Sequence, residues 1–154
     1  MNSNIKPSNR GVVVDVIDPD AYAPATLTTD WISAADFANF CAIICWGTLG
    51  TSDTINAKFE QATTSGGTGA KDVTGKAITE VDSTDSPEPH DQQAIINCRS
   101  DELDVANDFD YIRLSVTLAS TSSPLGTSDL GAILLGFDAR YAPADDATSV
   151  AEVV

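Results

Sequence analysis

The chain has 154 residues, of which 23 are acidic and 8 are basic, so its formal net charge at pH 7 is −15. The basic residues are scattered from Lys6 to Arg140. This excludes the basic patch that binding to nucleic acid or to an anionic membrane surface requires. Because the length suits one domain, we expect a single β-sandwich domain over 1–154, with 1–10 as an N-terminal arm and 142–154 as a C-terminal tail.

The type of acidic residue indicates the fold class. Asp supplies 18 of the 23 acidic residues, and Asp favours turns and caps, whereas Glu is a good helix former. No segment carries apolar residues at helical spacing over the ~10–12 residues that a helix prediction needs. The sequence therefore predicts an all-β protein with a turn-rich, acidic surface.

The first predicted strand is Gly11–Ile17, a β-branched run that we expect to end in a turn at Asp18-Pro19-Asp20. A shorter strand is predicted over Leu27–Ile32. Ser33–Phe37 suits either a single helical turn or a corner. Asn39–Thr48 is apolar on both faces, which predicts a central strand or one face of an interface.

Five further strands are predicted, and polar loops rich in Gly, Pro, Ser, Thr and Asp separate them. They are Ile55–Ala62, Val73–Val81, Gln93–Arg99, Phe109–Ala119 and Ala132–Tyr141. In the last of them the alternation places Ile133, Leu135 and Phe137 together on one face. About eight strands in one chain predict a single antiparallel β-sandwich, jelly-roll-like, with extended termini. Periodicity alone does not distinguish this topology from an immunoglobulin-like one.

The three cysteines are expected to be free, buried thiols. Cys41, Cys45 and Cys98 are an odd number, and Cys41 and Cys45 on one strand would lie about 13 Å apart at ~3.3 Å per residue, too far to form a disulfide. The sequence also has no apolar segment typical of a secretory signal or a membrane span, so we expect synthesis in a cytosol.

The sequence offers no recognisable catalytic motif. His90 is the single histidine, and it lies in the polar, proline-containing loop 82–91, where we expect a solvated side chain. No Gly-x-Ser-x-Gly motif is present. We therefore expect no enzymatic activity and no cofactor.

Two acidic loops are weak candidates for calcium binding, because calcium accepts irregular sets of oxygen ligands. The candidates are Asp82, Asp85 and Glu88 in one loop and Asp101 and Asp104 in the other. Neither loop has the glycine-containing EF-hand spacing. The favoured interpretation is a solvated run of charges, with no metal bound.

Other side chains are candidates for ion pairs or interfaces. Strand-borne Arg113 and Arg140 are expected to pair with neighbours such as Asp110 or Asp138, or to reach across an interface. The interface candidates are Trp31, Trp46, Tyr141 and Arg140. Trp46 suits a core or an interface position, and Tyr22, Trp31 and Trp46 could also stack on a sugar.

The order of the segments resembles a known family. An apolar strand and an alternating strand span 36–81, QAIINCRSDELDVANDFDYIRLSVTLAS follows, and AILLGFDARYAPA closes the pattern. Over roughly residues 26–144 this resembles the small capsid decoration (cement or head-spike) proteins encoded beside the major capsid protein in tailed bacteriophages and phage-like particles. The resemblance rests on the pattern of strands and on the endings DYIRLSV and GFDARYAP.

This resemblance implies a structural virion protein that binds the outer surface of the major capsid protein lattice and stabilises the head. It implies a homo-oligomer, with a trimer favoured, located at the capsid surface of a virion assembled in a bacterial cytoplasm. Neither nucleic acid nor a membrane is expected as a partner. Two alternatives stay open: a tail-associated, receptor- or glycan-binding β-sandwich, and a head–tail connector or tail-tube subunit.

Overall fold

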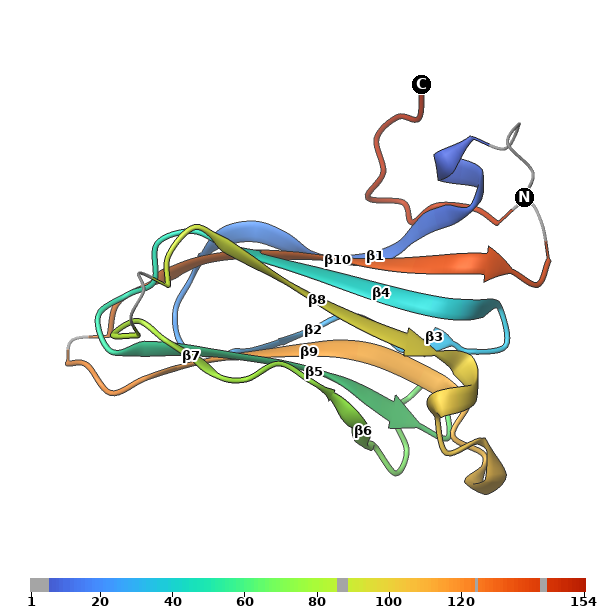
Figure 1. The fold of residues 1–154 in the computed structure, drawn as a ribbon, viewed down its shortest axis with the longest axis horizontal. Helices are drawn as coiled ribbons and strands as arrows, with labels where there is room; N and C mark the ends of the chain where they lie inside the picture. Colours follow the sequence, from blue (N-terminus) through green and yellow to red (C-terminus); the bar gives the residue numbers. More distant parts are fainter. Residues whose placement is uncertain (1–5, 86–88, 124, 142–143) are drawn as a thin grey trace.

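The computed structural model describes residues 6–85, 89–123, 125–141 and 144–154, and it consists of two antiparallel β-sheets packed face to face (Figure 1). The first sheet has the order β1-β10-β4-β8, with the bounds β1 Gly11–Tyr22, β10 Ser128–Ala139, β4 Phe37–Trp46 and β8 Gln92–Arg99. The second sheet has the order β2-β9-β5-β6, with the bounds β2 Thr26–Thr28, β9 Tyr111–Ser120, β5 Asp53–Ala62 and β6 Lys71–Ala77.

Two short strands and three 3-10 helices complete the described elements. Strand β3 (Ile32–Ser33) pairs with β9, and strand β7 (Val81–Asp82) pairs with β5. The helices are η1 (Pro7–Asn9), η2 (Ser100–Glu102) and η3 (Val105–Asn107). Among the described residues, no helix has the length and apolar character needed to span a bilayer.

The pairing of the strands is that of a jelly roll. When β3 is taken as the continuation of β2, and β7 as that of β6, the chain has eight strands. The first pairs with the last, the second with the seventh, the third with the sixth and the fourth with the fifth. This nesting gives the two four-stranded sheets of a jelly roll. An immunoglobulin sandwich instead places several consecutive strands side by side, so the alternative left open by periodicity is resolved.

The expected strand boundaries are wrong in three places. Asp18-Pro19-Asp20 is not a turn, because β1 continues through it with a register shift between Ile17 and Asp20. The strand predicted over Leu27–Ile32 is divided into β2 and β3. The division occurs where the Thr29 hydroxyl, rather than a backbone carbonyl, accepts the Leu114 N–H at 2.9 Å.

The third error is in Val73–Val81, which the structure divides into β6 and β7. Gly75 has a φ of +74° there, a conformation that glycine adopts without steric cost. The pairing with β5 is irregular over the same stretch. The segment predicted as a helical turn or a corner at Ser33–Phe37 is the corner, closed by the Asp36 N–H donating to the Ser33 carbonyl at 3.3 Å.

The core lies between the two sheets and is built mainly from aromatic and branched side chains. Its largest fully buried apolar members are Phe40, Phe59, Ile44, Ile55, Ile112, Leu114, Leu134 and Val116. On β10 the inward residues are Leu130, Ala132 and Leu134, so the stripe of Ile133, Leu135 and Phe137 is on the other, outer face.

Candidate interaction surface

The outer face of the β1-β10-β4-β8 sheet carries a row of branched apolar side chains. The strand register places Val16 beside Ile133, Ile133 beside Ile43, and Ile43 beside Ile95. Ile95 is 61% exposed and Ile133 is 42% exposed. The row therefore crosses all four strands and faces solvent.

The neighbouring rows on this face are uncharged on β10, β4 and β8, and Asp18 borders them on β1. They consist of Val13, Leu135, Cys41 and Asn97 on one side, and of Gly131, Cys45 and Gln93 on the other. With strands ~4.8 Å apart and side chains repeating about every 7 Å, the three rows cover roughly 20 Å by 20 Å, or about 400 Å². A patch of this size is in the range of the largest apolar patch on a typical monomer, and such patches are often functional.

The outer face of the opposite sheet differs sharply. It presents Lys58, Glu60 and Arg113, and the Lys58 Nζ lies 3.3 Å from a Glu60 carboxylate oxygen and 2.6 Å from one of Asp72. A polar, solvated outer face is the usual arrangement for an antiparallel sheet that packs on one side only. In a chain of net charge −15, the uncharged face of the first sheet is the unusual one.

The C-terminal segment lies beside this apolar face. The Ala147 N–H donates to the Val13 carbonyl at 2.7 Å, and the Val13 N–H donates to Asp146 Oδ1 at 2.9 Å. Val150 of the same segment and Val16 are among the residues that line a groove of about 410 Å³. Figure 1 shows this segment and η1 together on the outer side of the sheet, above β1 and β10 near the end where β10 finishes.

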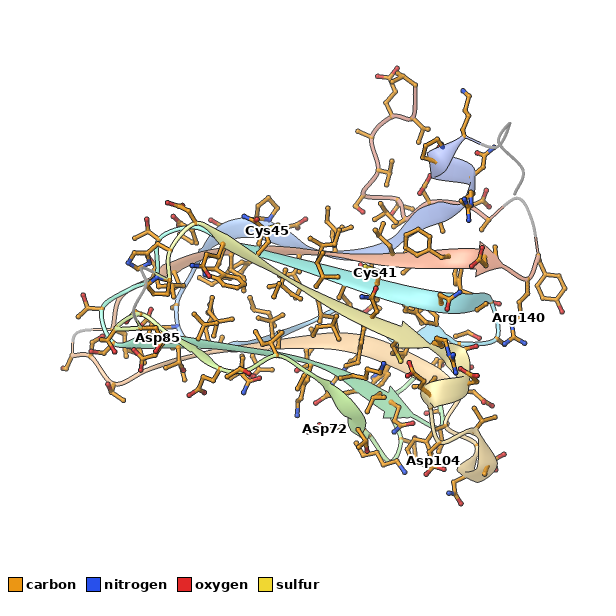
Figure 2. All side chains as sticks on the ribbon, viewed as in Figure 1. Cys41, Cys45, Asp72, Asp85, Asp104 and Arg140 are labelled. Carbon is orange, nitrogen blue, oxygen red and sulfur yellow. The ribbon has the colours of Figure 1, made fainter. Side chains whose placement is uncertain are left out.

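The structure does not bring the two acidic loops together. Figure 2 places Asp85 at one end of the sandwich and Asp104 at the other. No group of three His, Cys, Asp or Glu side chains in the described ranges is arranged to hold a metal ion. Glu88 lies outside the described residues.

The described carboxylates of these loops have partners within the protein. Asp82 Oδ1 accepts hydrogen bonds from the Thr84 hydroxyl and backbone N–H, both at 2.7 Å, and these bonds hold the pKa of Asp82 below its ordinary value. Asp85 Oδ2 accepts the Asp82 N–H at 2.9 Å. Asp101 pairs with Arg99 at 2.8 Å. The Asp104 pKa is lowered first by its hydrogen bond with Lys71.

Arg113 and Arg140 both contact partners within the protein, but these are not the expected aspartates. The Arg113 guanidinium lies 2.8 Å from Glu60 Oε2, opposite it in the β5–β9 register, and it stacks 4.4 Å from the centre of the Trp31 ring. Asp110 was therefore the wrong partner for Arg113. Arg140 donates from Nη2 to Ser100 Oγ at 3.2 Å and makes no ion pair with Asp138 among the described contacts.

The remaining interface candidates lie off the apolar face. Trp46 is only 5% exposed, and its Nε1 donates to the Pro89 carbonyl at 2.7 Å, so it is a core residue. Tyr141 is 80% exposed and follows β10. The sequence reasoning did not select Ile95, Ile133 or Val16, although the doubly apolar pattern of 39–48 had indicated an interface strand.

Two further expectations need correction. The thiols are free, as expected, but Cys98 alone is buried: Cys41 is half-buried and Cys45 is exposed. His90 is half-buried, and its Nδ1 accepts the Leu49 N–H at 3.0 Å. The histidine therefore holds a loop in place and is not simply solvated.

Comparison with known proteins gave little similarity. No family model matches the sequence, and no curated protein matches it. A chain in the structure of infectious bursal disease virus Gt strain is 11% identical, with a TM-score of 0.44 over 85% of this chain and 32% of that chain. A chain of the Gx strain structure is 10% identical, with a TM-score of 0.37 over the same shares. The protein thus spans about a third of the length of those chains.

Proposed function

We propose that this protein is a structural subunit of a virus particle, without catalytic activity or cofactor. It binds the outer surface of a capsid lattice through the outer face of the β1-β10-β4-β8 sheet and stabilises the particle. The observation that carries this proposal is the uncharged row of Val16, Ile133, Ile43 and Ile95 on an otherwise acidic molecule. The assignment to a phage-type capsid rests on the sequence resemblance described above.

The contrast between the two outer faces supports attachment to the capsid through the apolar face only. Covering the whole patch of about 400 Å² contributes at most roughly 10 kcal/mol at about 25 cal/mol per Å² of apolar area, because the patch also includes Gln93 and Asn97. This is similar to the estimated 4–15 kcal/mol that association costs in lost motion. One face alone thus binds modestly, and repeated copies on a lattice gain from multivalency. The charged outer face around Lys58 and Glu60 then suits the side exposed to solvent.

The strong negative charge suits the same role. Like charges keep unassembled copies soluble and discourage packing onto nucleic acid. The acidic turns around the apolar face would also steer the protein toward a basic region of a capsid subunit. Binding of this kind is expected to weaken as salt screens the attraction.

The experiment is a binding assay on capsid shells that lack the protein. Purified protein is added, and attachment is measured by sedimentation and imaging, with a fixed stoichiometry as the expected result. Ile133→Lys places a charge in the apolar row and should abolish attachment. Thr117→Lys, on the outer face of the opposite sheet, should leave it intact. Failure of the unmodified protein to attach, or equal attachment of both variants, would contradict the proposal.

The glycan-binding alternative has no specific observation in its favour. Trp46 is buried and Trp31 is covered by Arg113, while the Tyr22 hydroxyl donates to the Asp18 carbonyl at 2.7 Å. The two tryptophan rings are therefore committed within the protein, and the hydrogen bond of Tyr22 fixes the orientation of its ring. Specific binding on a glycan array would reverse this preference.

A further inference from the structure

The two edges of the β1-β10-β4-β8 sheet are unequally protected. At the β1 edge, two register shifts and Pro19 interrupt the strand, and the C-terminal segment occupies both the N–H and the carbonyl of Val13. Such features prevent a sheet edge from pairing with another chain. The β8 edge has none of them: Gln92–Arg99 pairs with β4 in unbroken register and contains no Pro, no Gly and no charge before Arg99.

The backbone groups that face outward from β8 can be identified. The Arg99 N–H donates to Glu102 Oε2 at 2.8 Å, so it faces away from β4. Because orientation alternates along a strand, the N–H and carbonyl groups of Asn97, Ile95 and Gln93 face the same way. Within the described ranges, no hydrogen bond joins these six groups to another segment.

We propose that β8 pairs antiparallel with β8 of a second copy, with Ile95 opposite Ile95. The two four-stranded sheets then form one continuous eight-stranded sheet across a two-fold axis. In this register Gln93 lies opposite Asn97 of the second copy, and the reverse holds by symmetry. The outward-facing N–H and carbonyl groups of Gln93, Ile95 and Asn97 all meet partners in the second copy, which makes six hydrogen bonds across the junction.

The side chains along the junction are uncharged. In this register Gln93, Ile95 and Asn97 meet Asn97, Ile95 and Gln93 of the second copy, and no residue from Gln92 to Cys98 carries a charge. Two molecules of charge −15 can therefore approach along this stretch without opposing carboxylates. Arg99, at the end of the strand, is bound to Asp101 of its own chain. A shift of two residues would leave outward backbone groups unpaired.

This inference does not depend on the proposed attachment to a capsid. Pairing of identical antiparallel strands is isologous and closes with two-fold symmetry, so it gives a dimer in place of the trimer that the sequence resemblance favoured. It also extends the apolar row, because Ile95 of one copy continues it into Ile95 and Ile43 of the next.

Cysteine cross-linking tests the register. In a background carrying Cys41→Ser and Cys45→Ser, Ile95→Cys should form a covalent dimer on oxidation, because a hydrogen-bonded pair has Cα atoms about 5.5 Å apart, within disulfide range. Gln93→Cys alone should not cross-link, since its counterpart lies about 13 Å away. A mixture of Gln93→Cys with Asn97→Cys should cross-link. Equal cross-linking of Gln93→Cys alone would overturn the register.

Sedimentation velocity tests the dimer itself. The unmodified protein should be a dimer, and Asn97→Pro should make it monomeric by removing an outward N–H that β4 does not use. Ile95→Lys should weaken dimerisation by more than about tenfold, or about 1.4 kcal/mol. The Ile133→Lys variant introduces the same charge away from the β8 edge, and this variant should remain a dimer. Circular dichroism checks that each variant folds.

The outcomes separate this inference from the proposed function. A monomeric or trimeric unmodified protein would overturn the β8 junction, as would a monomeric Ile133→Lys variant, which would indicate stacking of sheet faces. A dimer that fails to bind capsid shells would refute only the proposed function. Shells that bind a monomeric protein would support that function while refuting the junction.

Discussion

The Ser128 hydroxyl donates a hydrogen bond to Asp53 Oδ2 at 2.7 Å, and both side chains are fully buried. Ser128 begins β10 of one sheet and Asp53 begins β5 of the other, so the bond joins the two layers at one end of the sandwich. Ser128 Oγ also accepts the Gly50 N–H at 3.0 Å. Asp53 Oδ1 has no hydrogen-bond partner among the described residues. A buried carboxylate thus depends on one hydroxyl.

Removal of that hydroxyl should be costly. In Ser128→Ala, both the Asp53 carboxylate and the Gly50 N–H lose their partner in a buried site. Leaving buried polar groups unsatisfied costs about 1–3 kcal/mol each, and more for a charge. We expect a loss of about 3 kcal/mol in the free energy of unfolding, measured by urea denaturation, and a lower Tm.

Asp53→Asn is the matched variant for the same site. It keeps an oxygen that can accept the Ser128 hydrogen bond while removing a buried charge. It should therefore destabilise the protein less than Ser128→Ala does. If Asp53→Asn were the more damaging change, the carboxylate charge itself would be stabilising the fold, contrary to this interpretation.

A second prediction concerns Arg113, which touches Trp31 and Glu60 at once. Arg113→Ala removes a mostly buried ion pair and a cation–π contact, so we expect a loss of about 1–2 kcal/mol in the free energy of unfolding. Arg113→Lys keeps the charge but lacks the planar fork, and it should recover only part of this loss. Full recovery by lysine would show that the planar guanidinium contributes nothing beyond its positive charge.

The strands were predictable because their two-residue period is a local property. For β5, β8 and β9 the expected bounds match the observed ones within about two residues. The turn predicted at Asp18-Pro19-Asp20 failed for a non-local reason. These residues lie on an edge strand, where a proline and a bulge are tolerated, and a sequence pattern does not tell an edge strand from a central one.

Alternation also does not say which face of a strand is inside. On β10 the face with larger side chains, Ile133 and Leu135, points outward, whereas Ala132 and Gly136 point inward. The reason is a partner distant in sequence: a Cβ added at Gly136 would meet the Phe37 ring at 2.7 Å. The small inward residues make room for that ring, and the candidate surface follows from this packing.

The cysteines give a third prediction, because their environments differ. Cys45 is exposed and should react first with a thiol reagent in the folded protein at pH 8. Burial raises the pKa of Cys41, and it raises that of Cys98 to about 11. Since the thiolate is the reactive form, Cys41 should react more slowly and Cys98 should be protected until unfolding.

The thiols are counted by titration before and after denaturation without reductant. Unfolded protein should yield all three thiols, as free cysteines require. A Cys45→Ser variant should remove the fast phase and leave the protected thiol unchanged. A fast phase that persists in this variant would contradict the assignment.

The last prediction concerns acid stability at the end of β8. Glu102 lies 2.7 Å from the Lys76 Nζ, and its Oε2 accepts the Arg99 N–H at 2.8 Å. The Lys76 hydrogen bond, followed by that of Arg99, lowers the pKa of Glu102 below its ordinary value of 4.5. A carboxyl group with a lower pKa in the folded state stabilises that state above pH 4.5. It loses this contribution as the pH falls through the folded pKa.

Glu102→Gln should therefore reduce the free energy of unfolding at pH 7 by up to about 1 kcal/mol, the range of exposed ion pairs. It should also flatten the decline in stability below pH 4.5, because the variant has one fewer carboxylate to protonate. Urea unfolding at several pH values measures both effects. Glu80→Gln, at an exposed position with no ion pair among the described contacts, is the control and should leave the pH profile unchanged. An equally steep decline in Glu102→Gln would show that other carboxylates dominate the acid transition.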